Sequence, residues 1–126
     1  MKMIRKIVLP ILLATIWISI SEFIRNELLV KSYWIQHYEK LGLVFPSEPI
    51  NGAIWGLWSL FFAISIFIIS KKFSFIQTLG LSWMVGFVLM WIVVGNMGVL
   101  PVKILYVTFP LSIFEVFLAT LIIKKL

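Results

Sequence analysis

Long uncharged apolar stretches, separated by short polar segments, dominate the pattern of this chain. Three runs carry no charged residue, and a fourth carries only Glu115: residues 7–21, 49–70, 73–102 and 104–123. A helix that crosses a bilayer needs about 20 mostly apolar residues, because each residue rises about 1.5 Å. We therefore predict transmembrane helices near residues 5–24, 50–70, 74–95 and 103–123.

The segment between the first two predicted spans is amphipathic. On a helical wheel, residues 26–41 place apolar and aromatic side chains on one face, namely Val30, Tyr33, Trp34, His37, Tyr38 and Leu41. Asn26 is a suitable N-cap and Gly42 a suitable C′ residue. We expect a short extracytoplasmic helix that lies in the membrane interface. The predicted fold class is therefore an all-α, integral membrane four-helix bundle, with residues 1–126 as a single transmembrane domain.

The composition supports a membrane protein and argues against a water-soluble one. Apolar residues make up 62% of the chain and charged residues 13%, whereas soluble domains have roughly half and a quarter, respectively. The net charge of +6 is spread around apolar segments, without a basic helix or stripe. We therefore expect membrane lipids as partners and no nucleic acid.

Positive charges are divided unequally between the two sides of the predicted bundle. One side collects Lys2, Arg5, Lys6, Lys71, Lys72, Lys124 and Lys125. The other side balances four basic residues against Glu22, Glu27, Glu39 and Glu48. The positive-inside rule then places both termini in the cytoplasm, and the short loops favour a bacterial inner membrane. This asymmetry also argues against a dual-topology protein of the small multidrug transporter kind.

The first span has an alternative interpretation as a secretory signal peptide. Residues 1–6 would be its basic region, residues 7–18 its apolar region, and Ser19-Ile20-Ser21 a small-x-small cleavage site. The apolar run continues through Phe23 and Ile24, however. We therefore expect an uncleaved transmembrane helix, and cleavage stays the alternative.

Glu115 is the clearest polar exception within the spans. Its position in the fourth span is about 12 Å from the cytoplasmic end and about 18 Å from the outer end. A carboxyl group at that depth must face the bundle or water, and it is expected to be neutral unless it is paired. Ser82 and Thr15 are predicted at the same depth, and Lys and Arg are not. Glu115 is then either a proton- or cation-responsive site bonded to Ser82 or Thr15, or a neutral carboxyl group that joins helices.

Trp and Tyr gather in the outer half of the predicted bundle. An interfacial aromatic belt is the usual explanation. Trp55 and Trp58, however, are predicted about 8–12 Å below the outer surface, deeper than a belt requires. Together with Trp91 they can line an outward cleft that binds an apolar or cationic small molecule by stacking and cation–π contacts.

Three more polar residues lie at the predicted outer edge. Glu22 and Arg25 form either a surface pair of little energetic value or a pair that faces the cleft. We expect His37 to be an interfacial aromatic residue rather than a ligand or a base. The chain has no Cys and one His, so we expect no metal site, no cofactor and no catalytic residue, although an enzymatic role stays open.

Small residues in the second and third spans favour close helix packing. The second span contains a GxxxG motif at Gly52 and Gly56, and the third has Gly80, Ser82 and Gly86. We expect these faces to pack together within one chain, with a homo-oligomer as the alternative. The functional expectation is binding or transport of a small apolar or cationic molecule. An accessory subunit that packs against a partner membrane protein or lipid is the alternative.

Overall fold

Four apolar helices, each long enough to cross a membrane, account for most of the computed structural model, which describes residues 2–126. They span Ile4–Leu29, Pro49–Ser70, Phe75–Asn96 and Val102–Lys125. Within the described residues the only other regular elements are helical as well. The prediction of an all-α chain with four such helices is confirmed, and their length and composition are those of an integral membrane protein.

The first long helix continues beyond its predicted end. It consists of η1 (Ile4–Val8), α1 (Leu9–Phe23) and η2 (Ile24–Leu29), with π-helical turns in η1 and η2. The helix stops at Val30, where φ is −122° and ψ is 6°. Asn26 therefore lies inside η2 and is not an N-cap, because the charged residues of this segment are accommodated within the helix.

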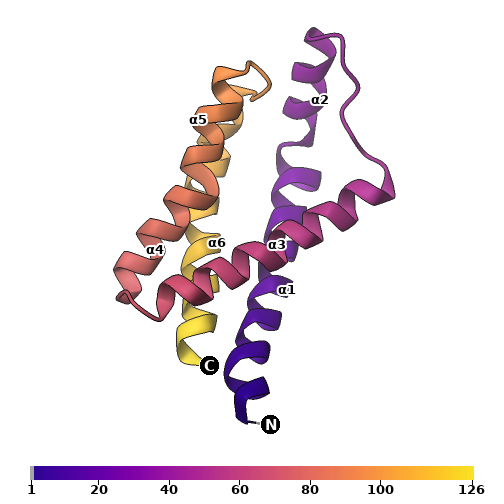
Figure 1. Cartoon of the computed structure of the whole chain (residues 1–126). Coiled ribbons are helices and arrows are strands. Elements are labelled where there is room, and N and C mark those ends of the chain that lie inside the picture. The colour runs from indigo at the N-terminus through magenta and orange to yellow at the C-terminus, as the bar shows by residue number, and fades with distance from the viewer. Residues whose placement is uncertain (1) are drawn as a thin grey trace.

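The predicted amphipathic helix is present but shorter. It is α2 (Lys31–Lys40), and it continues from η2 with a bend (Figure 1). Gly42 follows it with a φ of +74°, which is the left-handed conformation that glycine adopts at a helix C-terminus. The helix and its terminating glycine agree with the sequence pattern, whereas its place in the membrane interface remains a prediction.

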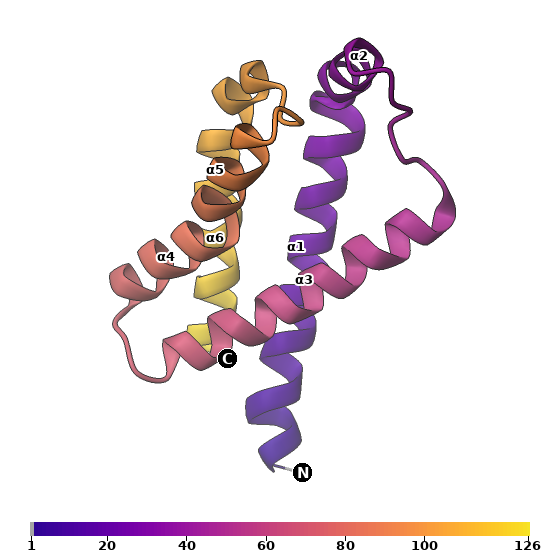
Figure 2. The ribbon, with the colours of Figure 1, turned by 45° about the horizontal axis from the view of Figure 1, so that its top comes forward.

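Helix α3 (Pro49–Ser70) is strongly tilted relative to the other long helices and crosses them (Figures 1 and 2). Pro49 occupies its first turn, where a missing N–H costs nothing. Glu48 precedes the helix, and its backbone N–H donates to Asn51 Oδ1 at 3.0 Å. This start lies away from the other helices, at the end of the extended segment 41–48 that descends from α2.

The third long helix is formed by α4 (Phe75–Trp83), the π-helical η3 (Met84–Val88) and α5 (Leu89–Asn96). Ser74 caps it, because its Oγ accepts from Gln77 N at 3.2 Å. The last helix consists of η4 (Val102–Ile104) and α6 (Leu105–Lys125). Pro110 lies inside α6, where it removes one backbone donor.

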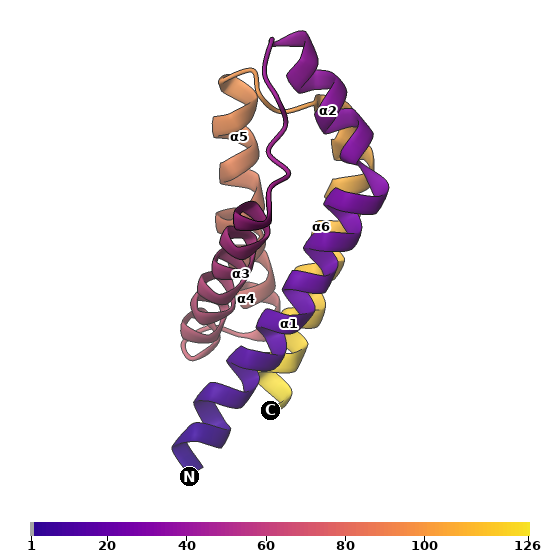
Figure 3. The ribbon, with the colours of Figure 1, turned by 90° about the vertical axis from the view of Figure 1, so that its right-hand side faces the viewer.

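Both termini and the turn between α3 and α4 lie at one end of the molecule, called here the terminal end (Figure 1). The opposite end, called the α2 end, carries α2 and the loop 97–101. Lys124 Nζ donates to the carbonyl oxygens of Ser70 and Phe73, at 3.0 and 2.7 Å, and so joins the C-terminus to the α3–α4 turn. Helices α1 and α6 run side by side (Figure 3).

The main core lies where α3 crosses α1, α6 and η3. Its buried members are Ala14, Ile18, Phe62, Ala63, Ile66, Phe87, Val116, Ala119 and Ile123. Gly86 permits this crossing, because a Cβ at Gly86 would lie 2.5 Å from the ring of Phe62. A Cβ at Gly52 or Gly56 would meet nothing within 4 Å. The prediction that the GxxxG motif packs against the third span is therefore wrong, since α3 is tilted away there.

A second apolar cluster holds α2 onto the loop between the third and fourth long helices. Val30, Leu100 and Ile104 are buried in it, and Trp34 and Trp91 pack against them. His37 Nε2 lies 2.7 Å from the carbonyl oxygen of Gly98 and donates to it. His37 is therefore a link between α2 and loop 97–101.

Candidate functional site

A charged cluster is buried between the first and last long helices. Arg25 Nη1 lies 3.3 Å from Glu115 Oε1, and Arg25 Nη2 donates to Glu22 Oε2. The exposed fractions are 3% for Glu22, 4% for Arg25 and 0% for Glu115. One guanidinium group thus bridges two carboxyl groups that come from different helices.

Helical geometry on the first span positions two members of this cluster. Glu22 and Arg25 are three residues apart, so their side chains share one face. Asn26 Nδ2 adds a hydrogen bond of 3.0 Å to Glu22 Oε2. The guanidinium carbon of Arg25 lies 5.3 Å from the ring centroid of Phe87 in η3, which is a cation–π distance. The π-helical segments η2 and η3 therefore face each other across the cluster.

The third member is held by α6. Glu115 is in the middle of that helix, and its backbone carbonyl accepts a hydrogen bond of 2.9 Å from Trp17 Nε1 of α1. Backbone and side chain of Glu115 therefore both contact the first long helix. The cluster is a structural link between α6 and α1 as well as a candidate site.

Several polar atoms of the cluster lack a partner. Among residues 2–126, no hydrogen-bond partner is found for Glu22 Oε1, Arg25 Nε or Glu115 Oε2. An unpaired polar group away from water costs about 1–3 kcal/mol. One guanidinium compensates only one ionised carboxyl group, so the other either carries a proton or requires a second positive charge. The cluster therefore has room for one more positive charge and for further hydrogen bonds.

A cleft of about 700 Å³ opens beside this cluster, at the α2 end. Its wall includes residues of η2, α2, the 41–48 segment, the start of α3, η3 and α5. The aromatic members are Phe23, Trp34, Tyr38, Phe45, Trp55, Phe87 and Trp91. Glu22 and Arg25 line it, whereas Glu115 does not and lies behind Arg25. The cleft therefore combines an aromatic wall with a charged inner surface.

Carboxylates are concentrated at the cleft although the chain is basic. The wall contains Glu22, Glu27 and Glu48, and Arg25 is its only basic residue in the described part of the chain. With Glu115 behind Arg25, four of the five acidic residues of the chain gather here. Glu27 is paired on the surface with Lys31 at 2.8 Å. The cleft is acidic in a protein whose net charge is +6.

The structure brings only some of the predicted site residues together. Trp55 and Trp91 line the cleft, as does the Glu22–Arg25 pair. Trp58 does not line it, because its ring packs on Phe62 with centroids 5.0 Å apart. His37 is also outside the wall and bonds to loop 97–101 instead.

The predicted hydrogen bonds to Glu115 are wrong. Thr15 Oγ1 donates to the carbonyl oxygen of Ile11 at 2.7 Å. Ser82 Oγ is buried without a partner in the described chain. Sequence reasoning missed Arg25 as the partner because it counted only backbone depth, whereas a long Arg side chain reaches toward the bundle centre. The signal that could have revealed it was the Glu22–Arg25 spacing on a helix that continues to Leu29.

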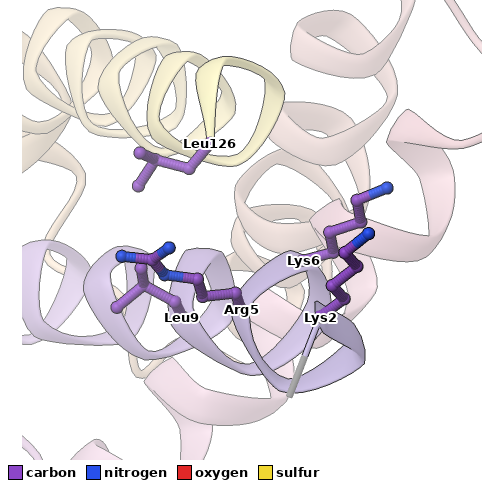
Figure 4. A pocket seen from close by; sticks show the side chains of 5 residues that line it. All are labelled: Lys2, Arg5, Lys6, Leu9 and Leu126. Carbon is purple, nitrogen blue, oxygen red and sulfur yellow. The ribbon is translucent and has the colours of Figure 1, made fainter.

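A second hollow, of about 550 Å³, lies at the terminal end (Figure 4). It is lined by Lys2, Arg5, Lys6, Leu9 and Leu126. The two lysines extend to one side of the first helix and Arg5 to the other (Figure 4). These cations are exposed, so they form a basic surface rather than an enclosed site.

Residues 2–126 contain no group of three or more His, Cys, Asp or Glu side chains that could hold a metal ion. The functional groups in the cleft wall include carboxyl groups, one guanidinium, hydroxyl and amide groups, and aromatic rings. No family model, no curated protein and no solved structure matches the chain.

Proposed function

We propose that the protein binds a small molecule with an apolar body in the cleft at the α2 end, as a ligand-binding or transport protein of a membrane. The observation that carries this proposal is the junction of an aromatic wall with the buried Glu22–Arg25 pair. Small-molecule sites usually measure about 300–1,000 Å³ and combine apolar walls with a few polar groups. The cleft has both properties.

Unsatisfied polar atoms support a ligand rather than an empty groove. Besides Glu22 and Arg25, the wall contains Trp34 and Thr108, whose Nε1 and Oγ1 atoms are buried without a partner within residues 2–126. Donors and acceptors left unpaired in a folded protein are unfavourable. A bound molecule with a polar head can satisfy several of them while its body contacts the aromatic rings.

We propose that the cleft faces the outside of the cell and that both termini are cytoplasmic, in a bacterial inner membrane. The basic residues at the terminal end support this orientation. The test uses the cysteine-free chain. A cysteine at Glu39 should react with a membrane-impermeant maleimide added to intact cells, and a cysteine at Lys71 should not. The reverse labelling pattern would contradict the orientation.

Filling the cleft tests the binding function directly. Gly56 lines the cleft, and a Cβ there meets nothing within 4 Å, so Gly56→Leu adds volume without a backbone clash. Gly80→Leu is the matched control, because Gly80 is equally open and lies outside the wall. Wild type and both variants are extracted from native membranes with their surrounding lipid, and bound molecules are identified by mass spectrometry.

We expect a molecule that copurifies with the wild type and with Gly80→Leu but is depleted in Gly56→Leu. Identical contents in all three samples would contradict binding in the cleft. If all three samples contain only bulk membrane lipid, in equal amounts, that result also contradicts binding in the cleft.

A second candidate function is that of an accessory subunit in a membrane complex. It is supported by Gly52 and Gly56, which leave α3 with an uncovered small-residue face that a helix of another protein, or of a second copy, could contact. Disulfide cross-linking of Gly52→Cys in native membranes tests it. A cross-linked product of defined mass supports this function, and a monomer after full oxidation contradicts it.

A further inference from the structure

We infer that the ligand of the cleft carries a monovalent organic ammonium head and that Glu22 Oε1 is its counter-ion. This inference rests on the proposed binding function and adds the chemical class of the ligand. It depends on charge balance, on the buried and unpaired Glu22 Oε1 in the wall, and on the aromatic rings of the cleft.

Charge balance is the first step. Arg25 is bonded to both Glu22 and Glu115, so its single positive charge is shared by two buried carboxyl groups. Buried charges are costly unless they are paired and fully hydrogen-bonded. One additional positive charge, either a proton on one of the carboxyl groups or the head of a monovalent cation, makes the cluster neutral, whereas an anionic head group cannot do so.

Glu22 is the acidic member of the cluster that both lines the cleft and has a carboxylate oxygen without a partner in the described chain. Its Oε2 accepts from Arg25 and Asn26, while its Oε1 has no partner among the described residues. Glu22 is 3% exposed and belongs to the cleft wall. An ammonium group at Oε1 would form a charge-assisted hydrogen bond, which is about twice as strong as a neutral one. Glu115 cannot take this role, because it lies behind Arg25.

The remaining cleft wall also favours a cation. Glu48 lines the wall at the start of α3. Near α2, the rings of Trp34 and Phe45 are stacked with centroids 5.8 Å apart, and Tyr38 meets Phe45 edge-on at 5.2 Å. Aromatic faces attract ammonium groups and also contact an alkyl body. A neutral alcohol of the same shape would gain only the apolar part of these contacts.

The experiment compares two probes that differ in the head group alone. 12-Bromododecylamine and 12-bromododecanol are titrated into the protein in zwitterionic nanodiscs, and binding is followed by bromine quenching of tryptophan fluorescence. Trp34, Trp55 and Trp91 line the cleft and report on it. Empty nanodiscs correct for partitioning into lipid. Glu22→Gln removes the proposed counter-ion but keeps an acceptor for Arg25, and Glu39→Gln, on the exposed face of α2, is the matched control.

In the wild type and in Glu39→Gln we expect the amine to bind about tenfold more tightly than the alcohol. In Glu22→Gln the preference for the amine over the alcohol should disappear. Equal binding of both probes by the wild type would overturn the inference and leave the proposed function intact. This outcome is measured on the wild type alone, so it can be obtained even if Glu22→Gln does not fold. A preference that survives in Glu22→Gln would also overturn it. Binding of neither probe above the empty-nanodisc level would overturn the proposed function itself.

Discussion

Arg25 and Glu115, separated by 90 positions in the chain, form the ion pair that joins the first long helix to the last, with Nη1 and Oε1 3.3 Å apart. Both side chains are almost completely buried. Glu22 completes the cluster on the same helix as Arg25. The polar centre of the molecule is therefore shared by its two terminal helices.

Removal of Arg25 should destabilise the fold strongly. Arg25→Met leaves two buried carboxyl groups without their counter-ion, and breaking a buried pair in this way costs about 3 kcal/mol or more. We expect that loss in the free energy of unfolding, measured by denaturant titration in mixed micelles. The triple variant Glu22→Gln, Arg25→Met, Glu115→Gln should recover most of the loss, because no unpaired charge remains. A single variant as stable as the wild type would show that the ion pair is not a structural link.

Gly86 should not tolerate a side chain. A Cβ at Gly86 would lie 2.5 Å from the Phe62 ring, which is itself packed against Trp58 and Phe87. Gly86→Ala should therefore lower the free energy of unfolding by about 1–3 kcal/mol through overpacking. Gly80→Ala is the control, because nothing lies within 4 Å of a Cβ there. Equal stability of the two variants would contradict the close crossing of α3 and η3.

His37 should hold α2 in place. His37→Ala removes the hydrogen bond to the Gly98 carbonyl, which we expect to contribute about 0.5–1.5 kcal/mol. Amide hydrogen exchange should become faster in both residues 31–40 and loop 97–101, because each segment loses the other's support. Gln36→Ala, on the exposed side of the same helix, should change neither. If amide exchange became faster in α2 alone, His37 would stabilise only its own helix, and the predicted link to loop 97–101 would be contradicted.

Water should reach one half of α3 and not the other. Gly56 lines the cleft, whereas Ala63, two turns further along, is fully buried in the core. In the cysteine-free chain, a water-soluble maleimide should modify Gly56→Cys and leave Ala63→Cys unmodified. Equal reactivity of both positions would contradict the division of α3 into a cleft half and a core half.

The helices were predictable from the sequence because their signals are local. Pro49 marks the start of α3 and Gly42 the end of α2, and both signals depend only on the backbone conformation of the residue itself. The end of the first long helix was harder, since the charges at Arg25 and Glu27 suggested a loop. Arg25 is paired with Glu22 on the same helix and Glu27 with Lys31 at the start of α2, so the helix continues to Leu29.

The candidate site was predictable only in part. Of the three tryptophans that the sequence suggested for a cleft, Trp55 and Trp91 line the cleft of the structure and Trp58 does not. The tilt of α3 decides which of its small residues pack against other helices. This tilt depends on contacts between residues far apart in the chain, such as Phe62 and Gly86. The Arg25–Glu115 pair likewise requires the neighbourhood of α1 and α6, which no local pattern specifies.

The division of the buried charges between the first and last long helices has a consequence for how the bundle holds together. The first long helix contains both Glu22 and Arg25, so it brings an acid together with its own base. The last helix brings only Glu115, whose cationic partner is already in place on the first. The carboxyl group of Glu115 therefore gains its counter-ion only when the last long helix packs against the first, so the ion pair belongs to the folded bundle and to neither helix alone.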